Sequence, residues 1–174
     1  MQLPRSSFIL GGAASGKSLW AEALTQSYGV PMVYLATGQI FDTEVAARVK
    51  THQARRDHRW TTIEAPLDLS VALMGLNSEQ VVLIDCATMW LSNHLMAEND
   101  IAHAQNNLIQ ALRKCAAPWL IVSNEVGHGI VPDNAMARQF RETQGRLNIA
   151  LAAEAELAVQ IIAGLPQVLK GVLP

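Results

Sequence analysis

The feature that most restricts the fold of this chain is a glycine-rich segment between an apolar run and a helical pattern. The apolar run covers residues 8–10, and the helical pattern covers residues 16–27. Between them, the pattern GxxxxGK[ST] is satisfied by Gly11-Gly12-Ala13-Ala14-Ser15-Gly16-Lys17-Ser18. Glycines let the backbone wrap so that N–H groups point inward, and the following helix N-terminus adds partial positive charge. The segment predicts a phosphate-binding loop.

The rest of the chain continues this alternation of short apolar runs and longer helical patterns. Strands are predicted at 8–10, 32–36, 81–84, 119–122 and 157–162, and helices at 16–27, 43–56, 90–97, 101–114 and 134–154. Residues 61–64 are a further candidate strand, and Asp68 is a candidate cap for a short helix that ends at Gly75. The apolar runs lack polar alternation, which is typical of a sheet covered on both faces. We therefore expect an α/β, P-loop NTPase-like three-layer fold with a mostly parallel central sheet.

Composition narrows the class of protein further. The 174 residues suit a single domain over 1–174, and a net charge of -2 provides no general attraction for nucleic acid or an anionic membrane. No segment has the length and hydrophobicity of a signal peptide or a membrane span. The two cysteines, Cys86 and Cys115, have no framework spacing and are expected to be reduced. A cytoplasmic protein without membrane insertion is expected.

An acidic residue follows one of the apolar runs, and a metal-dependent phosphate site requires such a residue. The run at 81–84 ends in Asp85. In open α/β sheets ligands collect at the carboxyl edge of the strands, so Asp85 and the phosphate loop are expected to face each other. Lys17 would then reach the β and γ phosphates, while Ser18 and Asp85 would hold Mg²⁺. The alternative is that Asp85 caps the following helix, and both roles are compatible.

Residues 48–59 hold an unusual concentration of positive charge. Five of the thirteen Lys and Arg residues lie there: Arg48, Lys50, Arg55, Arg56 and Arg59. In a helix, Arg48, His52 and Arg56 share one stripe. Neighbouring cations favour the neutral imidazole, which is a nucleophile, and guanidinium groups would neutralise phosphate oxygens as a P–N bond forms. The alternative is an ordinary solvated face with an exposed histidine.

Several further segments match a known family when they are taken with the phosphate loop. They are Tyr34-Leu35-Ala36-Thr37, Asp42-Thr43-Glu44-Val45-Ala46-Ala47-Arg48-Val49 with His52, Arg56 and Trp60, Ile84-Asp85-Cys86 with Asn93, and Asn124-Glu125-Val126-Gly127-His128-Gly129-Ile130-Val131-Pro132. Over about residues 8–170 the chain resembles the bifunctional adenosylcobinamide kinase / adenosylcobinamide-phosphate guanylyltransferases of cobalamin biosynthesis. The last segment is far more specific than the phosphate loop, which unrelated NTPases share.

The resemblance implies a two-step enzyme. ATP or GTP first phosphorylates the aminopropanol hydroxyl of adenosylcobinamide, and GTP then transfers GMP to that phosphate through a covalent GMP–histidine. His52 matches the guanylylated histidine, so the expected catalytic residues are His52, Lys17 and Asp85. Because attack must reach the α phosphorus, either the nucleotide binds differently in this step or His52 swings toward it, so the helix at 43–56 is expected to be mobile. The family also implies a homotrimer.

The resemblance also implies a set of nucleotide contacts. They are Gly11, Gly12, Ala13, Ala14, Ser15, Gly16, Lys17, Ser18, Ala36, Thr37, Gly38, Gln53, Ala54, Arg55, Arg56, Glu64 and Asp85. One departure concerns Ala14, which stands where the family commonly has an arginine, so one possible phosphate contact is lost. Glu125 is a further candidate for a contact with metal or substrate, with a structural role in its turn as the alternative.

Two other functions fit part of this pattern. A monofunctional P-loop kinase for a small molecule would use the basic segment as a substrate lid and release no pyrophosphate. A GTP-binding regulatory module would use triphosphate occupancy as a switch and turn over nothing. The position of His52 within its arginine stripe favours the two-step enzyme over both.

Overall fold

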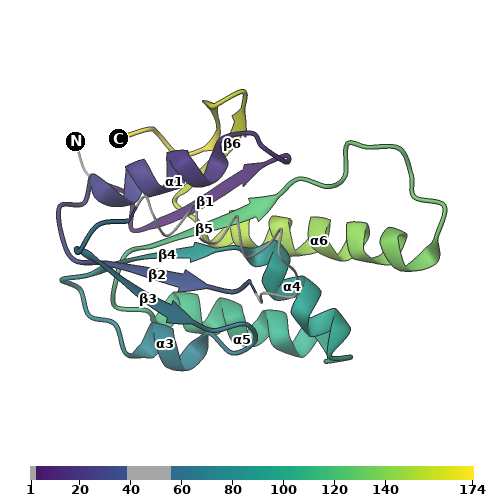
Figure 1. The fold of residues 1–174 in the computed structure, drawn as a ribbon, viewed down its shortest axis with the longest axis horizontal. Helices are drawn as coiled ribbons and strands as arrows, with labels where there is room; N and C mark the ends of the chain where they lie inside the picture. Colours follow the sequence, from purple (N-terminus) through teal and green to yellow (C-terminus); the bar gives the residue numbers. More distant parts are fainter. Residues whose placement is uncertain (1–2, 39–55) are drawn as a thin grey trace.

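The apolar segments of the sequence form the strands of one sheet, and helices lie on its two faces (Figure 1). The structure is a computed structural model that describes residues 3–38 and 56–174. The elements of the described residues, in chain order, are β1 (Ser6–Gly11), α1 (Lys17–Gln26), β2 (Met32–Ala36), β3 (Trp60–Glu64), α3 (Ser70–Met74), β4 (Val81–Asp85), α4 (Ala87–Met96), α5 (Ile101–Lys114), β5 (Trp119–Asn124), α6 (Ala135–Glu154), β6 (Leu157–Ile162) and β7 (Leu165–Lys170).

The sheet has the strand order β3-β2-β4-β5-β1-β6-β7. All neighbouring strands pair in parallel except β6 and β7, which are antiparallel. In the central strand β4, the four apolar residues before Asp85 are all 0% exposed: Val81, Val82, Leu83 and Ile84. A strand with both faces covered has no solvent side on which a polar residue is favoured. The expected mostly parallel α/β fold is confirmed.

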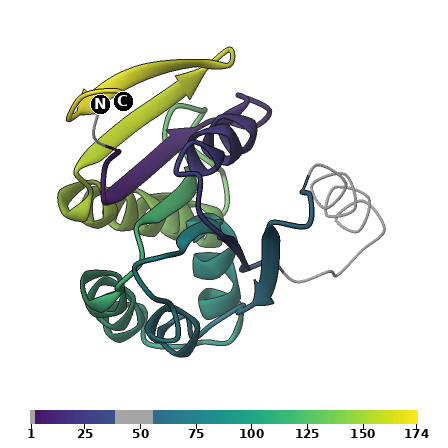
Figure 2. The same ribbon diagram turned by 90° about the vertical axis from the view of Figure 1, so that its left-hand side faces the viewer.

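Helices cover both faces of the sheet and make three layers (Figure 2). On one face α1 packs Ala21 and Leu24 against a cluster that includes Leu83 of β4. On the other face α3, α4, α5 and α6 bury a larger cluster, which includes Trp90 and Leu112. Burying a large apolar side chain contributes about 1.5–3 kcal/mol, so these two clusters fix where the helices lie.

The parallel strands bring their carboxyl ends to the same edge of the sheet (Figure 1). Strand β1 ends at Gly11, where the phosphate loop begins, and β4 ends at Asp85. Ala36 of β2 is paired in register with Asp85 on one side and with Glu64 of β3 on the other. The carboxyl edge therefore collects the loop and the ends of β2, β3 and β4.

Most of the predicted elements are observed, and one was not expected. The candidate strand at 61–64 is β3, and the short helix before Gly75 is α3, preceded by Asp68, whose carboxylate accepts the Ser70 N–H at 2.8 Å. The sequence indicated no strand after β6, but β7 extends the sheet there because it pairs with β6 through a two-residue turn. The helix expected at 43–56 lies outside the described residues, apart from Arg56.

Both cysteines, Cys86 and Cys115, are buried free thiols, as expected. Among the described residues, no helix combines the length and apolar character needed to cross a membrane.

Candidate functional site

The phosphate loop connects the end of β1 to the first turn of α1. Two of its residues, Ala14 with φ 54 and Gly16 with φ 91, have left-handed backbone conformations. Gly16 is the N-cap residue of α1, and no side chain caps the helix there. N–H groups at such a helix start lack intrahelical acceptors, which makes them available to phosphate oxygens. The exposed Ala14 adds no polar side chain to the loop.

Lys17 lies over the loop that precedes it. Its Nζ atom donates a hydrogen bond to the Gly12 carbonyl oxygen at 3.0 Å, and the Ser15 N–H donates to the same oxygen at 3.3 Å. Burial lowers the pKa of Lys17 from its usual value, and the charge of Asp85 opposes that shift. Lys17, in the first turn of α1, and Asp85, at the end of β4, therefore lie close enough for their charges to interact.

Asp85 is held by a tyrosine that the sequence had not marked as a site residue. The Tyr34 hydroxyl donates to Asp85 Oδ2 at 3.0 Å, and the Arg56 guanidinium lies 3.5 Å from the centre of the Tyr34 ring. Burial raises the pKa of Tyr34 far above its usual value, so the phenol keeps its proton and remains a donor. Tyr34 therefore contacts both charged residues: its ring faces the Arg56 guanidinium in a cation–π pair, and its hydroxyl binds the Asp85 carboxylate.

Tyr34 belongs to the family-matching segment Tyr34-Leu35-Ala36-Thr37, but that match assigns it no role. It is otherwise only a hydroxyl-bearing aromatic in the apolar segment Met32–Ala36. Its partner Asp85 is 51 residues away, and the two meet only because β2 and β4 are neighbours in the sheet. A local pattern carries no information about which strands pair, so this contact was missed.

Asp85 does not cap the helix that follows it. The N-cap residue of α4 is Cys86, whose Sγ accepts the Met89 N–H at 3.4 Å. Burial raises the pKa of the Cys86 thiol to about 12, so the group is protonated at neutral pH and has little thiolate for nucleophilic chemistry. The alternative that Asp85 caps α4 is therefore wrong, because Cys86 is the cap. The Asp85 carboxylate instead accepts the Tyr34 hydroxyl.

Thr37, an expected nucleotide contact, uses its side chain within the fold. Its Oγ1 donates to the Cys86 carbonyl and accepts the Cys86 N–H, each at 2.7 Å. The Thr37 carbonyl in turn accepts from Asn93 Nδ2 at 2.8 Å, and the same amide nitrogen reaches the Pro66 carbonyl at 2.9 Å. A buried acceptor left without its donor costs about 1–3 kcal/mol, so these bonds fix the turns that follow β2, β3 and β4.

The remaining predicted residues divide into those at the edge and those outside the described ranges. Ala36 and the exposed Glu64 end β2 and β3, the exposed Gly38 follows Thr37, and the half-buried Ser18 belongs to the first turn of α1. The other expected contacts and the expected nucleophile lie outside the described residues: His52, Gln53, Ala54 and Arg55.

Glu125 lies next to the phosphate loop, but its side chain stabilises its own turn. Its N–H donates to the Gly11 carbonyl at 3.0 Å, which carries the β5–β1 pairing one residue beyond the end of β5. Its Oε1 accepts the Gly127 N–H, and the Gly127 carbonyl accepts from Arg141 of α6. Of the two roles that the sequence allowed, the structural one is observed for this carboxylate.

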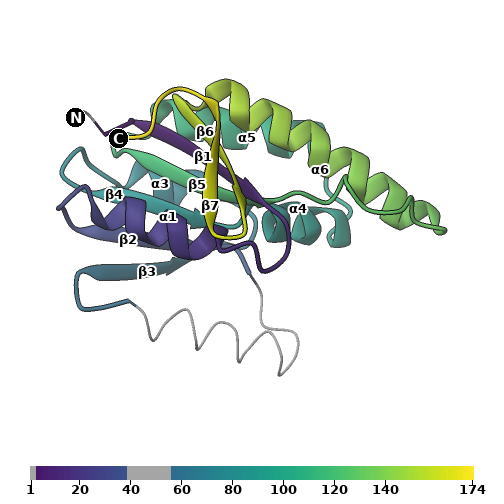
Figure 3. The same ribbon diagram turned by 90° about the horizontal axis from the view of Figure 1, so that it is seen from above.

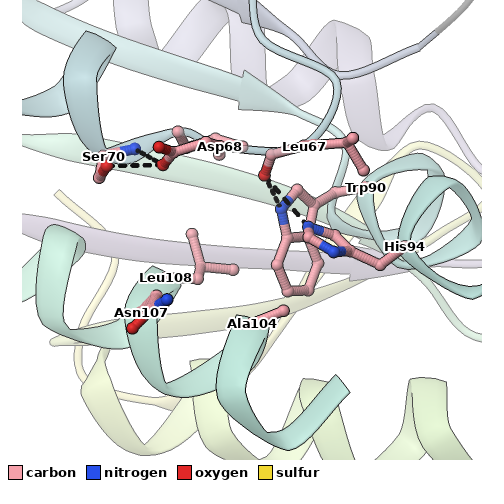
Figure 4. A pocket seen from close by; sticks show the side chains of 9 residues that line it. Leu67, Asp68, Ser70, Trp90, His94, Ala104, Asn107 and Leu108 are labelled. Atoms are coloured by element: carbon pink, nitrogen blue, oxygen red, sulfur yellow. Dashed lines mark hydrogen bonds between the residues drawn. The ribbon is translucent and has the colours of Figure 1, made fainter. Parts of the chain in front are cut away.

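A cavity of about 220 Å³ lies between α3, α4 and α5, and it contains none of the predicted site residues (Figure 4). Its aromatic wall is formed by Trp90 and His94, whose ring centres are 4.5 Å apart. Trp90 Nε1 donates to the Leu67 carbonyl at 2.7 Å, and His94 Nε2 lies 3.2 Å from the same oxygen. These polar atoms are engaged within the wall, so the carboxyl edge is the stronger candidate for a functional site.

Comparisons with known proteins identify the family of this chain. The model of the family described as cobinamide kinase / cobinamide phosphate guanyltransferase matches residues 7–169. The bifunctional adenosylcobalamin biosynthesis protein CobP of Pseudomonas aeruginosa is 37% identical over 166 residues, which cover 94% of this chain and 96% of that protein. CobU of Salmonella typhimurium, which carries the same bifunctional description, is 38% identical over 173 residues, covering 90% and 95%.

Similarity to solved structures concerns the fold alone. A prototypical ATPase from the type III secretion system of pathogenic bacteria superposes with a TM-score of 0.57 at 11% sequence identity, covering 94% of this chain and 56% of that one. The expected P-loop NTPase-like fold is confirmed. The family match spans nearly the whole chain, including the phosphate loop and Asp85. This chain therefore belongs to the cobinamide kinase / cobinamide phosphate guanyltransferase family.

Proposed function

We propose that this protein phosphorylates adenosylcobinamide and then transfers GMP from GTP to adenosylcobinamide phosphate, giving adenosylcobinamide-GDP and pyrophosphate. The observation that carries the proposal is the phosphate loop with Lys17 at the same carboxyl edge as Asp85. The relatives that this chain matches over nearly their full length are described as bifunctional. A loop and a carboxylate at one carboxyl edge are what phosphoryl transfer from a nucleotide needs.

In the kinase step the chain mainly binds and orients the triphosphate. The N–H groups at the start of α1 and the Lys17 ammonium neutralise phosphate oxygens, because positioning and charge stabilisation dominate phosphoryl transfer. Ser18 and Asp85 supply oxygen donors, which suit Mg²⁺ held jointly with substrate phosphates. When bound, that ion would neutralise charge that develops on the transferred group. Tyr34 keeps the Asp85 carboxylate oriented toward the edge.

In the transfer step His52 is the proposed nucleophile. A ring nitrogen attacks the α phosphorus of GTP, the P–N bond forms, and the bond to the bridging oxygen breaks as pyrophosphate leaves. A phosphate oxygen of adenosylcobinamide phosphate then attacks the same phosphorus and releases the imidazole. Support comes from the arginine stripe of the sequence and from Arg56, which lies on Tyr34 next to Asp85. A guanidinium there is suited to bind phosphate oxygens.

ATP and GTP both serve as candidate phosphoryl donors for the first step, the protein acts in the cytoplasm, and it assembles as a homotrimer. The exposed apolar side chains of Ile130, Val131 and Met136, which lie between β5 and the first turn of α6, support association of copies.

Product analysis with adenosylcobinamide, GTP and Mg²⁺ tests the proposal. The two-step enzyme yields adenosylcobinamide-GDP and one pyrophosphate for each GMP transferred. A monofunctional kinase would stop at adenosylcobinamide phosphate without pyrophosphate, and a regulatory module would bind GTP without any product. Either of those outcomes would contradict the proposed function.

Removing the Tyr34 hydroxyl is expected to loosen the Asp85 carboxylate without removing the ring beneath Arg56. In Tyr34→Phe the Mg²⁺ concentration that gives half-maximal phosphorylation should rise about tenfold, since groups that orient a metal ligand contribute about 10–100-fold. The matched control is Tyr28→Phe, which removes a hydroxyl that donates to the Pro4 carbonyl outside the site. An unchanged Mg²⁺ dependence in Tyr34→Phe would show that this hydrogen bond has no role in metal binding.

A further inference from the structure

The turn between β6 and β7 lies against the phosphate loop, although the two are about 150 residues apart in the chain. Figure 3 shows the β6–β7 hairpin reaching the loop that joins β1 to α1. The turn consists of Ala163 with φ 51 and Gly164 with φ 80, which are the two positive values of a tight hairpin turn. The Gly164 N–H donates a hydrogen bond to the Ser15 carbonyl oxygen at 2.8 Å.

This hydrogen bond fixes the orientation of one peptide group of the loop. The Ser15 carbonyl and the Gly16 N–H belong to the same planar trans peptide, in which C=O and N–H point in opposite directions. Because the carbonyl is directed at the hairpin, the Gly16 N–H must point away from the hairpin. That N–H immediately precedes Lys17 and lies at the N-terminus of α1, where phosphate oxygens are expected.

Two close approaches support the same contact. A Cβ atom added to Gly16 would lie 3.1 Å from Gly164 Cα, so the two glycines pack backbone to backbone. At the other end of the loop, Gly11 is the β1 residue paired in register with Ile161, just before the β6–β7 turn, and a Cβ atom on Gly11 would lie 3.0 Å from the Ile161 carbonyl oxygen. The end of the hairpin thus contacts both the first glycine of the loop and the one before Lys17.

We infer that Gly164 is a positioning residue for the triphosphate: its N–H holds the Ser15–Gly16 peptide so that the Gly16 N–H is oriented for a phosphate oxygen before the nucleotide arrives. The inference rests on the proposed function, since it assumes that the loop binds GTP. A preoriented donor to a charged group increases affinity because the loop does not have to reorganise on binding. The hairpin is therefore part of the nucleotide site as well as an extension of the sheet.

The test compares two substitutions at the same position by calorimetric titration with GTP and Mg²⁺. Gly164→Val is expected to weaken GTP binding about tenfold or more, because a β-branched residue rarely adopts positive φ and the donor must move. Gly164→Asn should bind within about twofold of wild type, since asparagine tolerates this conformation and keeps the N–H. A Cβ atom at position 164 meets nothing within 4 Å, so crowding does not separate the two variants.

Gly171→Ala is the control for general damage to the hairpin. Gly171, with φ 80, follows β7, and a Cβ atom there would press on the Glu156 backbone rather than on the loop. This variant should lower the melting temperature and leave GTP affinity within about twofold of wild type. If it weakens binding as much as Gly164→Val does, or if Gly164→Asn does so, the inference is wrong.

A second way to remove the donor is to replace Gly164 by glycolic acid through a suppressor tRNA. This substitution deletes the N–H and keeps the backbone freedom of glycine, so it tests the inference even if Gly164→Val does not fold. It should also weaken GTP binding about tenfold, and wild-type affinity in this variant would overturn the inference. Lys17→Ala distinguishes loss of the nucleotide site from loss of the Gly164 contact alone. If Lys17→Ala binds GTP as tightly as wild type, the proposed nucleotide site itself is contradicted, whereas loss in Lys17→Ala without loss at position 164 contradicts only the inference.

Discussion

Lys17→Ala is expected to reduce the rate of adenosylcobinamide phosphorylation by about 100–1000-fold. Lys17 is the cation at the start of α1, and its ammonium donates to the Gly12 carbonyl of the loop. Removing one preorganised donor from a site that stabilises developing charge typically has an effect of that size. The measurement is the initial rate of phosphorylated product at saturating nucleotide, with thermal unfolding to show that the variant is folded.

Lys114→Ala provides the matched control for the loss of one positive charge. Lys114 is exposed in the last turn of α5, on the face of the sheet opposite α1. Its replacement should leave the rate within about twofold of wild type, as is usual for surface substitutions away from a site. Phosphorylation by Lys17→Ala at more than a tenth of the wild-type rate would refute the assignment of the phosphate loop.

His52→Ala is expected to abolish covalent labelling of the protein by GTP that carries its label on the α phosphorus. Wild-type protein incubated with this GTP and Mg²⁺ should acquire label that acid removes, as expected of a P–N bond to imidazole. The variant has no ring nitrogen to attack the α phosphorus, so it should carry no label. It should still phosphorylate adenosylcobinamide, because the kinase step uses the loop, Lys17 and Asp85.

His58→Ala is the control for labelling at another histidine of the same basic segment. His58 is exposed and lies six residues beyond His52 in the chain, so its replacement should leave the label intact. Absence of label on the wild-type protein, or equal label on His52→Ala, would remove the covalent intermediate from the mechanism. The kinase proposal would be unaffected, since it rests on different residues.

Most of the fold was predictable because the relevant patterns are local. The predicted strands at 32–36 and 157–162 and the predicted helix at 101–114 have the observed bounds. Apolar runs without alternation mark strands that are covered on both faces, and 3.6-residue periodicity marks amphipathic helices. Strand β7 was missed because most of its residues carry exposed side chains and one is a proline, so the segment lacks the buried apolar run that marked the inner strands.

The candidate site was predictable only in part, because some of its contacts join residues far apart in the chain. The loop and Asp85 are each recognisable where they stand, since a glycine pattern or a carboxylate after a buried strand is a local feature. The role of Thr37 was not predictable from the sequence, because its hydroxyl forms hydrogen bonds with the backbone of Cys86, 49 residues away. Cys86, rather than Asp85, caps α4, and this depends on backbone angles at the strand end rather than on residue type alone.

The amino-acid sequence by itself determined the class of fold, the phosphate loop, the carboxylate at the end of β4 and the family to which the chain belongs. Only the tertiary structure decided that Tyr34 holds Asp85, that Arg56 lies on Tyr34, and that the Gly164 N–H is bonded to Ser15. The reason is that these contacts follow from which strands are neighbours and which turn meets which loop. Such pairings are set by the packing of distant segments around a common core, whereas periodicity and motifs report on neighbours along the chain.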